Sequence, residues 1–175
     1  RSMKKGLLFL GVFIAMAFAA AAQKFTTEFM FQEYFSKHLD TLDDIEGIWL
    51  VSTSQEFYRY DTLYDVLKLP KAAKVAVMKK QGKYDSYNLT GESYDVEFTV
   101  TDVRGVYFYV ISFPETQEHS KADAVISKDG SMEYKYEFPD KYLRFKLADT
   151  YEEGTHVTNE VKWTKIFPDN KKKRK

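Results

Sequence analysis

Apolar and polar residues alternate with a period of two along most of the chain beyond residue 44. The alternation is clearest over residues 95–101, 131–138 and 143–147, where every second side chain is apolar or aromatic. A strand with this pattern has one buried face and one solvated face, which is typical of antiparallel sheets. We count about nine such segments and expect a predominantly β protein.

Turn signals join these segments in sequence order. Gln81-Gly82 and Asp129-Gly130 each separate two β-like segments, and Asp-Gly supplies the positive φ angles of a tight hairpin. Short connections make sequence neighbours pair in the sheet. Closure removes the free edges of such a meander, so we expect an all-β, antiparallel up-and-down β-barrel of eight to nine strands. The alternative fold is a β-sandwich. No internal repeat or Gly/Ser/Pro-rich linker appears, which indicates one barrel domain over 45–168.

A short amphipathic helix is expected before the barrel, within the segment 23–44. Thr26 or Thr27 is suited to cap its start, and Phe31, Phe35 and Leu39 recur at four-residue spacing. The helix is therefore predicted over residues 25–42, with one apolar face.

The first residues have the layout of a secretory signal peptide over 3–22. Two lysines precede an apolar run over 7–22, which ends in four alanines that suit a signal peptidase. The alternative is a membrane anchor, but the run is shorter than the roughly 20 residues that span a bilayer. Arg1 and Ser2 precede the first methionine, and we interpret them as added residues. The mature protein is expected to begin near Gln23 and to be soluble, in the periplasm or outside the cell.

Composition limits the classes of partner and chemistry. The chain has 26 basic and 26 acidic residues, but five of the basic ones lie in 171–175, within a basic tail at 169–175. The body is therefore acidic, which argues against nucleic acid as a partner. The chain has no cysteine, so neither disulfides nor thiolate metal ligands are available.

Gly47 and Trp49 stand at the entry to the first β-like segment, where residues 44–51 read Asp-Ile-Glu-Gly-Ile-Trp-Leu-Val. A Gly two positions before a Trp at this place resembles the signature of the lipocalin (calycin) family, here in an exported bacterial protein. The resemblance implies that the Gly allows close approach at the barrel base and that the Trp packs across the closed end. It also implies that a basic residue of the last strand covers the indole, for which Lys162 and Lys165 are the candidates.

Catalytic or metal-binding motifs are missing. His38, His119 and His156 are far apart in sequence and form no HxH or HExxH pattern. A nucleophile elbow and a Gly-rich phosphate loop are also absent. We therefore expect a protein that is not an enzyme, with no metal and no cofactor.

Aromatic residues make up 17% of the chain and cluster over 106–111. They could fill the barrel or line an apolar pocket with tyrosine hydroxyls, as in many small-molecule sites. Tyr107 and Tyr109 are candidate ligand contacts. Because both faces of this segment are apolar, alternation leaves open which face points inward, and suggests cover on both sides.

The stretch 56–73 between the first two strands is too long for a hairpin turn and is rich in apolar residues. In lipocalin-like barrels the corresponding connection lies over the open mouth, and long ordered loops are often functional. Tyr58, Tyr60, Leu63 and Tyr64 are therefore further candidate contacts for a small apolar or amphipathic ligand. The alternative is a barrel filled by its own side chains that binds an envelope protein or a glycan through its outer surface.

Overall fold

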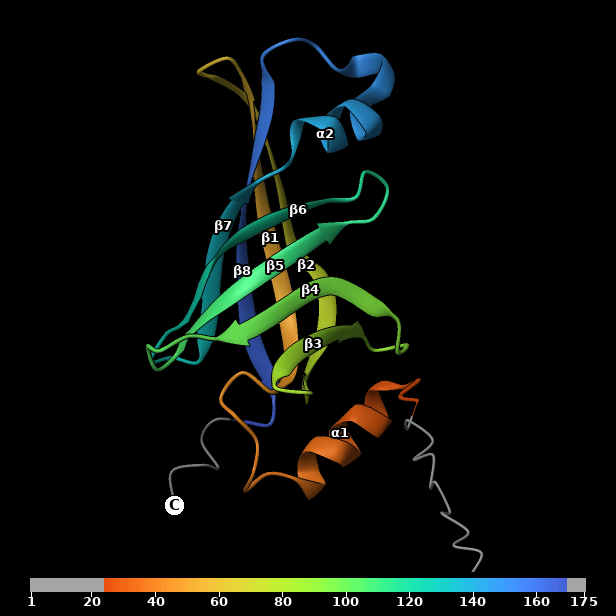
Figure 1. Ribbon diagram of the computed structural model, residues 1–175, viewed down its shortest axis with the longest axis vertical. Helices are drawn as coiled ribbons and strands as arrows, with labels where there is room; N and C mark the ends of the chain where they lie inside the picture. Colours follow the sequence, from red (N-terminus) through yellow and green to blue (C-terminus); the bar gives the residue numbers. More distant parts are fainter. Residues whose placement is uncertain (1–23, 170–175) are drawn as a thin grey trace, which may run out of the picture.

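The computed structural model describes residues 24–169. Eight antiparallel strands form a closed barrel in sequence order, with the last strand paired to the first (Figure 1). This confirms the expected up-and-down barrel and excludes the β-sandwich. Arg1, Ser2, the predicted signal peptide over 3–22 and tail residues 170–175 lie outside the described residues. The elements are α1 (Glu28–Lys37), β1 (Gly47–Arg59), β2 (Thr62–Lys80), β3 (Lys83–Asn88), β4 (Ser93–Val100), β5 (Val106–Phe113), β6 (Glu118–Ile126), β7 (Ser131–Glu137), α2 (Asp140–Leu147), a 3-10 helix (Ala148–Thr150) and β8 (Thr155–Phe167).

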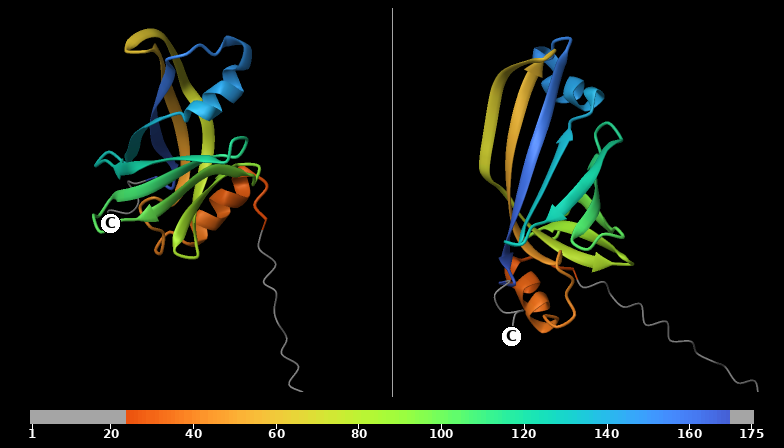
Figure 2. Two further views of the ribbon diagram at one scale, coloured as in Figure 1. Left: turned by 45° about the horizontal axis from the view of Figure 1, so that its top comes forward. Right: turned by 90° about the vertical axis from the view of Figure 1, so that its left-hand side faces the viewer.

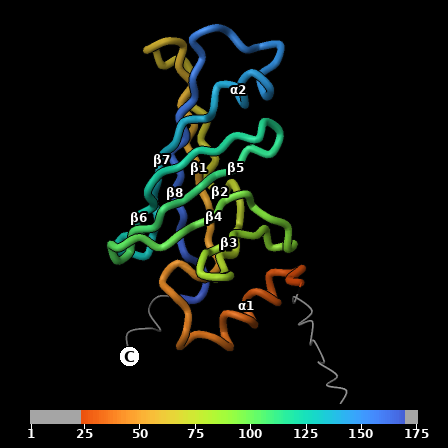
Figure 3. Tube along the Cα trace, viewed as in Figure 1, coloured from red at the N-terminus to blue at the C-terminus, as the bar shows by residue number. Residues whose placement is uncertain are grey.

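Helix α1 packs on the outer face of the barrel at one end. The Thr27 side chain accepts a hydrogen bond from the Met30 backbone N–H at 3.3 Å, which caps the helix. Phe31 and Phe35 are fully buried, in a cluster that includes Ile48 of β1. The described chain begins and ends at this end of the barrel, which we call the base (Figure 3).

Strands β1 and β2 form a long hairpin where a loop over 56–73 was expected. Their pairing continues to Arg59↔Thr62, and the chain reverses at Tyr60, whose φ is 51°. The loop interpretation was wrong because the aromatic and β-branched residues of this stretch favour extended pairing as much as they favour a lid. Only residues 75–80 of β2 pair with β3, so the upper part of the hairpin rises above β3–β6 together with β8, which pairs with β1 up to Arg59 (Figure 2).

Residues 143–147, expected to form a strand, belong to helix α2. Leu143 and Leu147 are four residues apart and suit a helical face as well as a strand face. Pro139 precedes the helix and Asp140 occupies its first turn, both of which favour a helix start. Leu143 is buried whereas Phe145 is 56% exposed, so their side chains lie on different faces.

The barrel interior is filled largely by aromatic side chains. Trp49 and Trp163 are both fully buried, with ring centroids 6.3 Å apart. On β5, Tyr107 and Tyr109 point inward, and Phe108 is 38% exposed. The expectation that both faces of this strand are covered was therefore wrong. Inward positions of β6 carry small residues such as Ala122 and Ala124, which leaves room for the large rings opposite.

Candidate functional site

Gly47 and Trp49 close the base of the barrel. Gly47 has a φ of 143°, and a Cβ atom at this position would lie 2.3 Å from the backbone oxygen of Phe167. The Trp49 indole N–H donates to the Ile45 carbonyl at 2.9 Å. Gly47 is therefore the residue that allows β1 and β8 to meet closely beneath the indole.

Of the two candidate lysines, Lys165 covers the indole. Its Nζ lies 4.8 Å from the centre of the Trp49 ring and donates to the carbonyls of Asp44 and Glu46. Lys162 lies on the outer surface, where its Nζ pairs with Glu133 at 2.7 Å. The sequence left open which of these two lysines covers the indole, and the structure shows that it is Lys165.

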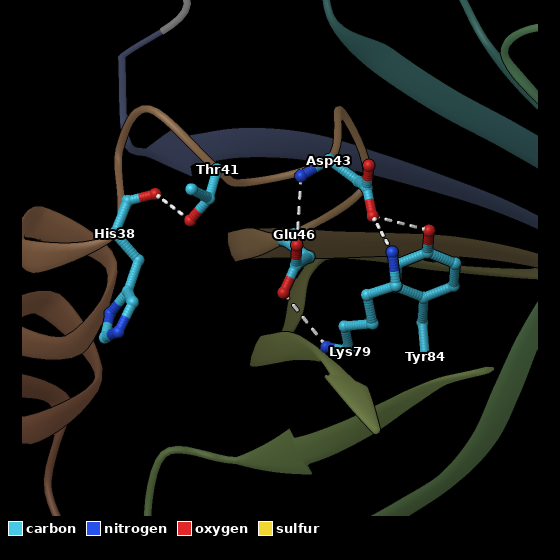
Figure 4. Close-up of polar contacts among 6 residues, drawn as sticks. All are labelled: His38, Thr41, Asp43, Glu46, Lys79 and Tyr84. Atoms are coloured by element: carbon cyan, nitrogen blue, oxygen red, sulfur yellow. Dashed lines mark hydrogen bonds and ion pairs between the residues drawn. The ribbon is translucent and has the colours of Figure 1, made fainter. Parts of the chain in front are cut away.

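A network of polar contacts stabilises the segment that leads into β1 (Figure 4). The buried Glu46 carboxylate accepts hydrogen bonds from the backbone N–H groups of Asp43 at 2.9 Å and Lys79 at 3.0 Å. Asp43 in turn accepts from the Tyr84 hydroxyl and from the Lys79 ammonium, both at 2.8 Å. The base is thus a cross-linked closed end, and any ligand would enter elsewhere.

The residues proposed from sequence as ligand contacts do not form one site. Tyr60, Leu63 and Tyr64 lie near the hairpin tip and are 63%, 47% and 51% exposed. Tyr58 stacks on His156 with ring centroids 4.8 Å apart. Tyr107 and Tyr109, by contrast, lie inside the barrel.

A cavity of about 250 Å³ lies in the barrel away from the base. Its walls come from β1, β4, β5, β7, β8 and α2, and most of its ring-bearing side chains are tyrosines. The lining residues are Thr53, Tyr94, Asp95, Val96, Ile111, Ser112, Phe113, Pro114, Glu115, Tyr134, Tyr136, Phe138, Tyr142, Asn159 and Val161. Polar and apolar atoms contribute about equally to its surface, so a molecule in it would meet ring faces and polar groups together.

Helix α2 lies at the end of the barrel opposite α1 (Figure 1), and its Tyr142 contributes to the cavity wall. The Tyr142 ring packs against Phe113 and Phe138 with centroid distances of 4.6 and 5.6 Å. Lys146 of α2 pairs with Glu115 of the β5–β6 turn at 2.8 Å. Lys141 of α2 also donates to the Thr116 carbonyl of this turn at 3.1 Å, so the helix is held by an aromatic cluster, an ion pair and a hydrogen bond.

Two buried polar atoms in the cavity wall have no hydrogen-bond partner within residues 24–169, namely Thr53 Oγ1 and Asn159 Oδ1. Asn159 is only 3% exposed, and its Nδ2 donates to the Tyr136 hydroxyl at 2.8 Å. Buried polar groups in proteins are nearly always hydrogen-bonded, so two atoms without a partner in the wall of one cavity call for an explanation.

The cavity tyrosines are neutral over the physiological pH range. Burial raises the pKa of Tyr136 to about 12 and holds the pKa of Tyr134 well above its usual range. Burial also raises the pKa of Tyr94 and Tyr142. These side chains therefore offer apolar ring faces and neutral hydroxyls to anything in the cavity.

The cavity residues were missed in the sequence, although a signal for two of them was present. Along β8 the inward row reads Val157, Asn159, Val161, Trp163, and Asn is the one strongly polar member. Along β1 the same face changes from the apolar Trp49 and Val51 to the polar Thr53 and Gln55. A polar residue in an otherwise apolar inward row marks an interior polar site.

A larger depression, of about 870 Å³, lies over the outer face of β7, β8, β1 and β2. Its charged side chains pair with one another, as in Lys135 with Glu160 at 3.0 Å and Lys162 with Glu133 at 2.7 Å. Because four of its five charged side chains are already matched and only Lys68 has no ion pair among the described residues, we regard the inner cavity as the better candidate site.

Within the described range, no group of three His, Cys, Asp or Glu side chains could hold a metal ion. No helix in this part of the chain is long and apolar enough to cross a membrane. No known protein family, curated protein or solved structure matches this chain.

Proposed function

We propose that this chain is an exported, lipocalin-like and non-catalytic protein that binds one small apolar or amphipathic molecule inside the barrel. The proposal places it in the periplasm or outside the cell, as the signal-like sequence over 3–22 suggests.

The observation that carries this proposal is the tyrosine-rich cavity beneath α2. A barrel of about eight strands has an interior that side chains fill or that holds one small ligand. An apolar cavity of about 150 Å³ is able to hold benzene, so about 250 Å³ suits one ring with substituents. The closed base and the covering helix support a binding site with access from the α2 end.

A thermal-shift screen of small ring compounds tests this proposal. A bound ligand stabilises the folded state by RT ln(1 + [L]/Kd), so a binder raises the melting temperature in proportion to its affinity. Val161→Phe is designed to fill the cavity, because Val161 is 5% exposed and lines it. The control Val125→Phe adds the same volume at a side chain that is 47% exposed on β6.

Wild type and Val125→Phe should respond equally to a binder, and Val161→Phe should lose the response while remaining folded. Equal responses of all three proteins would place binding outside the cavity.

A second candidate function is an interaction module that contacts an envelope protein or a glycan. The upper hairpin favours it, because Tyr60, Leu63, Tyr64 and Leu67 are all more than 40% exposed. A surface with several exposed apolar side chains is typical of an interaction site. Replacing Leu63 and Tyr64 with Ser should leave thermal shifts by cavity ligands intact and abolish only binding to such a partner.

A further inference from the structure

The two unpaired polar atoms of the cavity lie on neighbouring strands. Thr53 pairs with Val161 across the β1–β8 ladder, and Asn159 stands two residues from Val161 on the same face. Diagonal side chains of this kind are about 7–8 Å apart. The two atoms therefore belong to the same part of the cavity wall.

The two atoms differ in what they need: Asn159 Oδ1 needs a hydrogen-bond donor, whereas the Thr53 hydroxyl both donates and accepts. A carboxamide oxygen only accepts hydrogen bonds, and Asn159 Oδ1 has no donor among the described residues. The Asn159 amide is oriented by its Nδ2 contact to Tyr136, which directs the free oxygen away from that ring. Leaving such a group unpaired lowers stability, and a ligand with a hydroxyl or N–H donor would remove this cost.

Charge excludes an anionic ligand. The described lining residues include two carboxylates, Asp95 and Glu115, and no Lys, Arg or His. Glu115 is paired with Lys146 on the rim. A fatty acid or other carboxylate would therefore meet tyrosine rings and Asp95 without a cation to pair with it.

An ammonium ligand is also disfavoured at the unpaired atoms. Asp95 is exposed and stays solvated, whereas Asn159 is a neutral acceptor deep in the wall. A cation bound there would lose its hydration for one neutral amide and the ring faces.

We propose that Thr53 and Asn159 are the polar anchor of the cavity, and that its ligand is a small uncharged ring compound carrying a hydroxyl or N–H donor. This inference rests on the proposed function and adds the chemical class of the ligand. The aromatic walls contact the ring, and the anchor selects for the donor.

Four probes of nearly equal size test the chemical class: para-cresol, its methyl ether, para-toluate and para-methylbenzylamine. Their dissociation constants are measured by ligand-observed NMR with the wild type, Thr53→Val and Asn159→Leu. Thr164→Val, on the solvated face of β8, is the matched control. Thr53→Val keeps the shape of the side chain and removes only a hydroxyl that has no partner, so it should fold at least as stably as wild type.

Para-cresol should bind about tenfold more tightly than its methyl ether to the wild type and to Thr164→Val, the size expected for one neutral hydrogen bond. Toluate and the amine should bind more weakly still. In Asn159→Leu, cresol and its ether should bind equally, and in Thr53→Val cresol should bind more weakly than to the wild type.

Tightest binding of toluate or the amine would overturn the assignment of ligand class. Equal binding of cresol and its ether to the wild type would overturn the anchor and leave cavity binding intact. If Asn159→Leu fails to fold, Thr53→Val alone still decides, because an unchanged affinity for cresol in that variant contradicts the proposal. Absence of binding by all four probes to the wild type would count against the proposed function itself.

Discussion

The contact between Lys165 and Trp49 should be an energetic coupling that Lys162 lacks. Lys165 Nζ lies 4.8 Å from the indole centre and also donates to the Glu46 carbonyl at 2.9 Å. Lys162 lies three residues earlier on the same strand, and its ammonium pairs with a surface glutamate instead. Replacing each lysine with Met removes the charge and keeps an apolar stem of similar length.

The size of the coupling follows from the burial of the ring. Trp49 is fully buried, so Trp49→Leu removes ring volume and should cost about 2–4 kcal/mol of unfolding free energy, somewhat less than truncation to Ala. A cation over an indole contributes from about 0.5 kcal/mol at an exposed site to about 2 kcal/mol when desolvated. Lys165 is half-buried, so we expect a coupling near 1 kcal/mol.

A double-mutant cycle measures this coupling directly. Urea unfolding of the wild type, Trp49→Leu, Lys165→Met and the double variant yields the interaction energy. A second cycle uses Lys162→Met in place of Lys165→Met. We expect the effects of Trp49→Leu and Lys162→Met to be additive. Additivity in the Lys165 cycle, or equal coupling in both, would refute the assignment of the capping lysine.

Three further predictions concern the base, the tyrosines and the cavity cover. Gly47→Ala should lower the free energy of unfolding by about 3 kcal/mol, because the new Cβ would meet a backbone oxygen of β8. Gly82→Ala should lower it by only about 1 kcal/mol, because nothing lies within 4 Å of that Cβ. Equal losses in urea unfolding would contradict this prediction. The pKa of Tyr136 is about 12 in the folded state against an ordinary value of 10.0, so the folded state favours the neutral hydroxyl. Its contribution to the free energy of unfolding is present below pH 10 and should fall by about 2–3 kcal/mol as the pH rises to 12. A urea midpoint that stays constant over this range would contradict this prediction. Lys146→Met should speed association and dissociation of a cavity ligand in stopped-flow experiments by loosening α2, whereas Lys83→Met, which breaks an equally short surface pair of 2.8 Å, should change neither rate.

Periodicity predicts the barrel well and its local departures poorly. Alternation over 95–101 and 131–138 correctly indicates β4 and β7 because each strand has one dry face. It fails at Leu143 and Leu147, whose spacing suits a strand or a helix, and the neighbouring Pro139 decides for the helix. It also fails on β5, because a strand with apolar residues on both faces carries no signal for which face is buried.

The base was more predictable than the cavity. Gly47 and Trp49 belong to one short local pattern, although their partners Trp163, Lys165 and Phe167 all come from the distant strand β8. The cavity instead depends on Thr53 and Asn159, which are 106 positions apart and meet only because closure pairs β1 with β8. No local rule brings them together, although Asn159 interrupts an apolar inward row of β8.

Native mass spectrometry of the protein purified from its own host tests the central claim most directly. The wild type should carry a small bound compound, released on denaturation as a neutral molecule with a ring and a hydroxyl or N–H group. Val161→Phe, expressed and purified identically, should show the mass of the polypeptide alone. A wild-type spectrum with no bound compound, or the same compound on both proteins, would contradict ligand binding in the barrel cavity.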